Sequence, residues 1–77
     1  MKKLKYLRHS RNLTQQKLAV KSGVSQSYIN ELENGKKKNP STLVITKLAR
    51  ALNATVSDLL DDEDSWQVKE NGIHMAI

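Results

Sequence analysis

The sequence predicts an all-α fold of five short helices, and three observations support this prediction. Over residues 1–60 the apolar residues recur at intervals of three and four positions, which places them on one face of a helix. Residue types that favour helix N-caps stand before most of these segments, and Gly or Asn follows several of them. The 77 residues, of which 38% are hydrophobic, allow one small domain.

The first helix is expected from residue 2 to about residue 11. Its apolar stripe carries Leu4 and Leu7, which lie three positions apart. Asn12 is a stop signal, and Leu13 completes the stripe beyond it. The chain is therefore expected to turn at about residue 12.

Two short helices follow, over residues 15–22 and 26–33. Thr14 and Ser25 are their N-caps, and Gly23 between them suits the left-handed conformation that ends a helix. Lys17 occupies the position where a capping box would need Glu or Gln, so no box is expected at Thr14. The apolar residues expected to face inward are Leu18, Ala19, Ile29 and Leu32.

The fourth helix is expected to begin at residue 41 or 42, after a basic loop that ends at Pro40. Its inward stripe at positions i, i+3, i+4 and i+7 is Ile45, Leu48, Ala49 and Leu52. Thr55 caps a last short turn over residues 56–60. That turn is expected to contribute Val56, Leu59 and Leu60 to the core.

The last part of the chain changes period. Residues 61–64 form an acidic linker, and residues 65–77 form a tail with Asn71-Gly72 at its centre, the strongest short signal for a β-hairpin. A two-residue turn places one set of apolar residues on a shared face: Trp66, Val68, Ile73, Met75 and Ile77. The alternatives are a frayed tail, because an isolated hairpin is marginal in water, and a hairpin docked on the helical body.

The charge is divided unevenly along the chain. Residues 1–60 hold twelve Lys and Arg against three carboxylates, a formal +9, whereas residues 61–77 carry a formal −4. A basic body of this size indicates a polyanionic partner, most often nucleic acid. Lysines that merely solubilise helix surfaces are the alternative, and charge alone does not separate the two.

Two helices joined by a short Gly-containing turn form a helix-turn-helix unit, and residues 15–34 fit this pattern. The stretch LTQQKLAVKSGVSQSYINELENGK, from Leu13 to Lys36, resembles the phage repressor/Cro (Xre-like) family of bacterial DNA-binding domains. The resemblance runs from about Leu4 to Leu60. It implies a five-helix, phage-repressor-like domain over residues 1–60 that binds double-stranded DNA.

The resemblance also implies that the third helix lies in the major groove, with its N-terminal residues at the base edges. The residues expected to read bases are Ser25, Gln26, Ser27, Tyr28 and Asn30. Gln and Asn can pair with adenine through two hydrogen bonds, and a Tyr ring can pack on a thymine methyl group. Glu31 is either an acceptor for cytosine or a charge that repels phosphate.

Phosphate contacts are expected on both sides of this helix. The resemblance assigns Gln15 and Gln16 to one phosphate, and the positive end of the second helix supports the assignment. The basic loop Lys36, Lys37 and Lys38, with Asn39, is expected to bind on the other side. In the family pattern Arg8 pairs with Glu33, which is a structural role.

The sequence gives little support for other classes of protein. Cysteine is absent, which excludes disulfides and thiolate metal sites, and no stretch approaches the roughly 18 apolar residues that span a bilayer. His9 and His74 have no second ligand at helical spacing. We therefore expect a cytoplasmic protein without metal, cofactor, membrane segment or enzymatic activity.

The sequence thus predicts a transcriptional regulator, of the repressor type, that recognises a DNA operator as a homodimer joined through residues 65–77. One alternative is an antitoxin-type autoregulator whose tail binds a protein partner. Another is a protein-interaction module in which the helical body is only a scaffold. The basic residues beside the third helix argue against the scaffold, which has no use for them.

Overall fold

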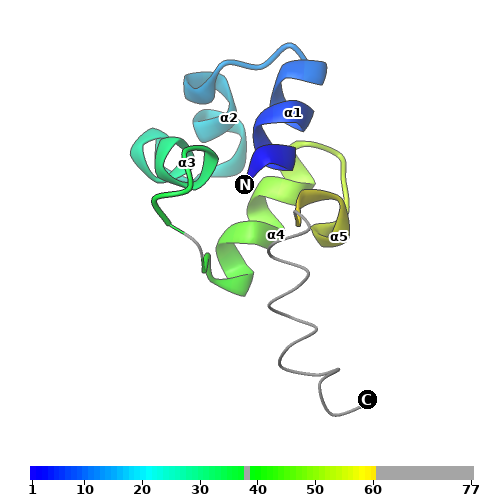
Figure 1. The fold of residues 1–77 in the computed structure, drawn as a ribbon. Coiled ribbons are helices and arrows are strands. Elements are labelled where there is room, and N and C mark those ends of the chain that lie inside the picture. Colours follow the sequence, from blue (N-terminus) through cyan, green and yellow to red (C-terminus); the bar gives the residue numbers. More distant parts are fainter. Residues whose placement is uncertain (38, 61–77) are drawn as a thin grey trace.

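The computed structural model describes residues 1–37 and 39–60, and within them the chain forms five helices and no strand (Figure 1). The helices are α1 (Lys2–Ser10), α2 (Gln15–Ser22), α3 (Gln26–Glu33), α4 (Thr42–Ala51) and α5 (Val56–Leu59). The all-α prediction is confirmed, with α1 and α5 each one residue shorter than expected. The predicted linker and hairpin, residues 61–64 and 65–77, lie outside the described residues, as does Lys38.

Side-chain caps define where the helices begin. The hydroxyl oxygens of four N-cap residues accept the backbone N–H three positions further on, and these residues are Thr14, Ser25, Ser41 and Thr55. At α5 the Asp58 carboxylate also accepts the Thr55 N–H, at 3.0 Å, which completes a capping box. The predicted starts of α2 to α5 are therefore confirmed, each with its physical cause.

Gly23 makes the turn between α2 and α3. Its φ of 78° lies in the left-handed region, and its N–H donates to the Ala19 carbonyl at 2.8 Å. Val24, the next residue, is buried and anchors the turn to the core. The turn therefore directs α3 away from α2 at a fixed angle.

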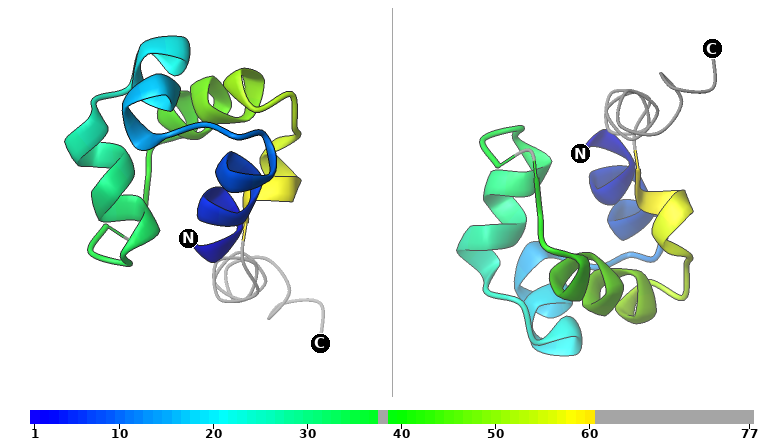
Figure 2. Two further views of the ribbon diagram at one scale, coloured as in Figure 1. Left: turned by 90° about the horizontal axis from the view of Figure 1, so that it is seen from above. Right: turned by 90° about the horizontal axis from the view of Figure 1, so that it is seen from below.

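Each of the five helices packs mainly against two others. α1 packs against α3 and α5, and α4 packs against α2 and α5, while α2 also contacts α3 (Figure 2). The core consists of Met1, Leu4, Leu18, Val24, Ile29, Leu32, Ile45, Leu48, Ala49, Ala51, Leu52 and Leu59. α3 lies at one edge of the bundle in every view, so one of its faces has no helix against it (Figures 1 and 2).

One expected core residue lies elsewhere. Val56 is 37% exposed, whereas Leu59 is fully buried and Leu60 packs beside it. The prediction for Val56 was wrong because the packing of the one-turn helix α5 against α1 and α4 buries Leu59 and leaves Val56 partly exposed. No helix in the described part of the chain is long and apolar enough to cross a bilayer.

Candidate nucleic-acid interface

Helix α3 has one apolar face and one polar face. Ile29 and Leu32 are completely buried, whereas Gln26, Ser27 and Asn30 are exposed. The three-residue spacing of the two apolar side chains turns them to the core together, which leaves the polar side chains on the outer edge of the bundle. The outer face of α3 can therefore offer hydrogen bonds to a partner.

An open depression of about 400 Å³ runs beside this face. It is lined by Gln15, Gln26, Ser27, Asn30, Glu31 and Lys36. The structure thus brings together three of the residues expected to read bases and two of those expected to contact phosphate. They come from the start of α2, from α3 and from the loop that follows α3.

The other two residues expected to read bases, Ser25 and Tyr28, make contacts within the protein. The Ser25 hydroxyl oxygen accepts the Tyr28 N–H at 3.1 Å as the N-cap of α3. The Tyr28 ring is half-buried against the core, and the Lys37 ammonium lies 5.2 Å from its centroid. Lys37 also pairs with Glu31 at 3.8 Å. These groups are less free to meet a base than Gln26 and Ser27 are.

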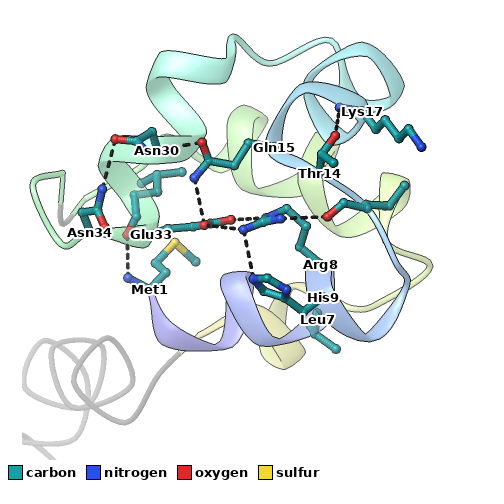
Figure 3. Close-up of polar contacts among 12 residues, drawn as sticks. Met1, Leu7, Arg8, His9, Thr14, Gln15, Lys17, Asn30, Glu33 and Asn34 are labelled. Carbon is teal, nitrogen blue, oxygen red and sulfur yellow. Dashed lines mark hydrogen bonds and ion pairs between the residues drawn. The ribbon is translucent and has the colours of Figure 1, made fainter.

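An ion pair between Arg8 and Glu33 joins α1 to α3 (Figure 3). Arg8 Nε lies 2.7 Å from Oε2 of the carboxylate and Nη2 lies 3.0 Å from Oε1, so the contact is bidentate. Arg8 Nη1 donates to the Leu13 carbonyl at 2.7 Å. The two side chains are only 8% and 2% exposed, so this contact braces the helix-turn-helix from the inside.

The carboxylate of Glu33 is ionised at neutral pH. Burial by itself would raise its pKa, but hydrogen bonds from Arg8 and Gln15 and the positive charges of Arg8 and Lys5 outweigh burial. The pKa of Glu33 therefore lies below its ordinary value of 4.5.

A chain of side-chain amides leads from Glu33 to the outer face of α3 (Figure 3). Gln15 Nε2 donates to Glu33 Oε1 at 3.0 Å, and Asn30 Nδ2 donates to Gln15 Oε1 at 3.3 Å. Asn34 Nδ2 in turn donates to Asn30 Oδ1 at 3.0 Å. This chain of amides was not predicted from the sequence, although the four-residue spacing of Asn30 and Asn34 is a signal for a contact within a helix.

The structure exposes only some of the residues that are expected to contact phosphate. Gln16, Lys36, Lys37 and Asn39 are exposed, whereas Gln15 is half-buried and its amide is bonded to Glu33 and Asn30. The N–H groups of Lys36 and Lys37 both donate to the Glu31 carbonyl, at 2.8 and 3.2 Å, so the loop begins as a tight turn off α3. Lys38 lies outside the described residues.

Comparison with known proteins gives an independent view of the same segment. Residues 4–59 match the family described as "Helix-turn-helix". The chain is similar to an uncharacterized HTH-type transcriptional regulator, RghRB, of Bacillus subtilis, with 42% identity over 57 residues that cover 74% of this chain. It is also similar to the HTH-type transcriptional repressor RghR of Bacillus subtilis, with 44% identity over 57 residues, again 74% of this chain.

An uncharacterized HTH-type transcriptional regulator of Archaeoglobus fulgidus is 39% identical over 67 residues, which cover 84% of this chain and 93% of that protein. The matched segment is 41% of RghRB and 42% of RghR, so this chain spans less than half the length of these two Bacillus relatives.

Proposed function

The chain belongs to the helix-turn-helix family, and from that premise we propose that it is a sequence-specific transcriptional regulator that reads the major groove of double-stranded DNA with α3. The observation that carries this proposal is the exposed polar face of α3. Gln26, Ser27 and Asn30 stand there on a helix whose opposite face is fully buried. Side chains of these types can match the donor and acceptor groups of base pairs.

The charge of the helical body, residues 1–60, suits a phosphate backbone as partner. The formal charge of +9 over residues 1–60 supplies the attraction that does not depend on sequence. Gln16 at the start of α2, with the N–H groups there, is proposed to bind one phosphate. Lys36, Lys37, Lys38 and Asn39 are proposed to bind the backbone on the other side of the groove.

Repression, and not activation, is the proposed outcome of binding, and the similarity to the transcriptional repressor RghR supports it. The protein is proposed to act as a homodimer in the cytoplasm, because one recognition helix covers only a few base pairs. The antitoxin and interaction-module alternatives gain no support, since the relatives described above are named as transcriptional regulators or repressors.

Selection of bound sites from random duplex DNA by the purified protein tests the proposal. The expected result is an enriched sequence in which two half-sites are related by a two-fold axis. A variant with both Gln26→Ala and Ser27→Ala should lose the enrichment, whereas Ser57→Ala, exposed on α5, should retain it. Failure of the wild-type protein to enrich any sequence over the input would overturn the proposed function.

A further inference from the structure

We propose that Gln15 and Asn34 are positioning residues that hold the Asn30 amide in a single orientation for reading a base. The buried Glu33 carboxylate sets that orientation through Gln15. This inference rests on the proposed function, because it concerns how one of its reading side chains is presented.

The orientation of each amide in this chain is determined from Glu33 outward. An ionised carboxylate can only accept hydrogen bonds, so Gln15 must turn its NH₂ group toward Glu33. The Gln15 carbonyl oxygen then points the other way, toward α3. That oxygen can only accept, so Asn30 must offer its own NH₂ group to it.

The same constraint reaches the far side of Asn30. Its Oδ1 faces Asn34, whose NH₂ group donates to it at 3.0 Å. If the Asn30 amide rotated by half a turn, its oxygen would face the Gln15 oxygen and its NH₂ group would face the Asn34 NH₂ group. The Gln15 contact would become repulsive, because Glu33 fixes the Gln15 amide, and the Asn34 contact would be lost unless that amide turned as well. Gln15 therefore selects the orientation of Asn30, and the hydrogen bond from Asn34 adds to its stability.

The fixed amide keeps the capacity to read a base. An amide nitrogen has two N–H groups and an amide oxygen has two lone pairs, and the protein uses one of each on Asn30. Asn30 is exposed, so the remaining N–H and lone pair are available to a partner. Adenine presents the matching pair in the major groove, the N7 acceptor and the N6 donor.

Holding the Asn30 amide in one orientation before DNA binds has a measurable effect on affinity. Immobilising a side chain on binding costs an amount equivalent to roughly a two- to twelvefold change in Kd, and an amide that is already held avoids this loss. This gain in affinity applies only to a base whose donor and acceptor match those of the Asn30 amide. It should therefore appear as a preference for one base and not as higher affinity for all sequences.

The test is Gln15→Met, which keeps the length of the side chain and removes its hydrogen bonds. The fold is expected to persist because both oxygens of Glu33 still accept from Arg8. The position that Asn30 reads is identified first, as the base pair whose preference changes in Asn30→Ala. At that position Gln15→Met should lower the ratio of Kd values between the second-best and the best base pair by about two- to twelvefold.

Two controls separate positioning from other roles. Gln16→Met, the same change at the next residue, should weaken binding to all sequences alike and leave the preference unchanged. In the Asn30→Ala background Gln15→Met should have no further effect on the preference, because its effect passes through Asn30. Asn34→Ala provides a second, exposed variant that should lower the same ratio.

A measurement without DNA completes the test. The side-chain amide protons of Asn30 should exchange with solvent more slowly in the wild type than in Gln15→Met. Equal exchange rates, or an unchanged base preference in both Gln15→Met and Asn34→Ala, would overturn the positioning role and leave the proposed function intact. The positioning role would also be overturned if Asn30→Ala left the base preference of the enriched site unchanged. If the wild-type protein enriched no site at all, the proposed function itself would be overturned.

Discussion

Arg8 illustrates how much of this small domain depends on single residues. Its guanidinium contacts Glu33 on α3, the Leu13 carbonyl before α2 and the adjacent His9 ring, at distances from 2.7 to 3.3 Å. A buried charge is tolerated only while its partner is present. Loss of either partner would therefore leave a buried charge on the other.

We predict that Arg8→Met lowers the free energy of unfolding by about 3–5 kcal/mol, because it leaves the Glu33 carboxylate buried without its partner. A core of this size supplies only about 3–5 kcal/mol in total, so the variant should be largely unfolded. Urea titration followed by circular dichroism measures the change.

Arg50→Met, on the exposed face of α4, is the control and should shift stability by less than about 0.5 kcal/mol. The double variant Arg8→Met with Glu33→Met should recover part of the loss, because neither charge then remains buried. An unchanged urea midpoint for Arg8→Met would contradict the bracing role.

The ion pair also predicts a dependence of stability on pH. The pKa of Glu33 is lower in the folded chain than its ordinary 4.5, so its contribution is fully present above that value and is lost as the pH falls through the folded pKa. Acid titration should therefore destabilise the wild type below about pH 4.5. Glu33→Gln should be less stable at neutral pH and should lose less stability on acidification. Parallel pH profiles for the two proteins would refute the assignment.

Among the exposed residues, Gln26 offers the sharpest test of base reading. Gln26→Ala should reduce affinity for the selected site by about 1–3 kcal/mol and relax the preference at one base pair. Affinity for random DNA should hardly change, because phosphate contacts dominate it. Fluorescence anisotropy with both DNAs measures the difference. Equal losses on the two DNAs would eliminate Gln26 as a reading residue.

At the scale of elements, the loop after α3 brings neighbouring lysines into different surroundings. Lys36 lines the depression beside α3, whereas the Lys37 ammonium lies 3.8 Å from the Glu31 carboxylate and 5.2 Å from the centroid of the Tyr28 ring. To reach a phosphate, Lys37 would have to leave those two contacts. Lys36 is therefore the better candidate for a direct contact.

Lys36→Ala should flatten the plot of log K against log salt concentration by roughly 0.9, the loss of one phosphate contact, and should weaken binding to all sequences alike. Lys37→Ala should have a smaller effect on the slope. Titrations at several salt concentrations compare the two variants, with Lys47→Ala on the exposed face of α4 as the control. A slope that neither loop variant changes would show that the loop is only solvated.

At the scale of the whole molecule, the proposed homodimer needs a surface that joins two copies of the chain. The large exposed apolar residues of α1, α2 and α4 are Tyr6, Val20 and Leu43, one on each helix. The predicted interface lies instead in the tail, whose apolar residues share one face only if residues 65–77 form a hairpin. Pairing two hairpins would bury both apolar faces.

We predict that deletion of residues 65–77 converts a dimer into a monomer and weakens binding to the two-fold symmetric site. Analytical ultracentrifugation at tens of micromolar measures the mass of both proteins. Thermal unfolding of the shortened chain shows whether residues 1–60 remain folded. A 77-residue chain that is already monomeric, or a shortened one that still dimerises, would exclude this mode of assembly.

Much of this fold could be predicted from the sequence. The N-caps Thr14, Ser25 and Thr55 and the left-handed Gly23 act on residues no more than four positions away, so the sequence alone determined where α2, α3 and α5 begin and where α2 ends. The spacing of Ile29 and Leu32 likewise determined which face of α3 is polar. The Arg8–Glu33 pair was expected from the family resemblance alone, since its partners are 25 residues apart.

Tertiary structure decided which polar side chains remain available on that face. The contacts of Gln15 with Asn30 and Glu33 span 15 and 18 residues, and they exist only because α2 and α3 cross at the Gly23 turn. Packing likewise left Val56 exposed. Local sequence determines helices because their hydrogen bonds are local, whereas the partner of a side chain depends on how the finished helices pack.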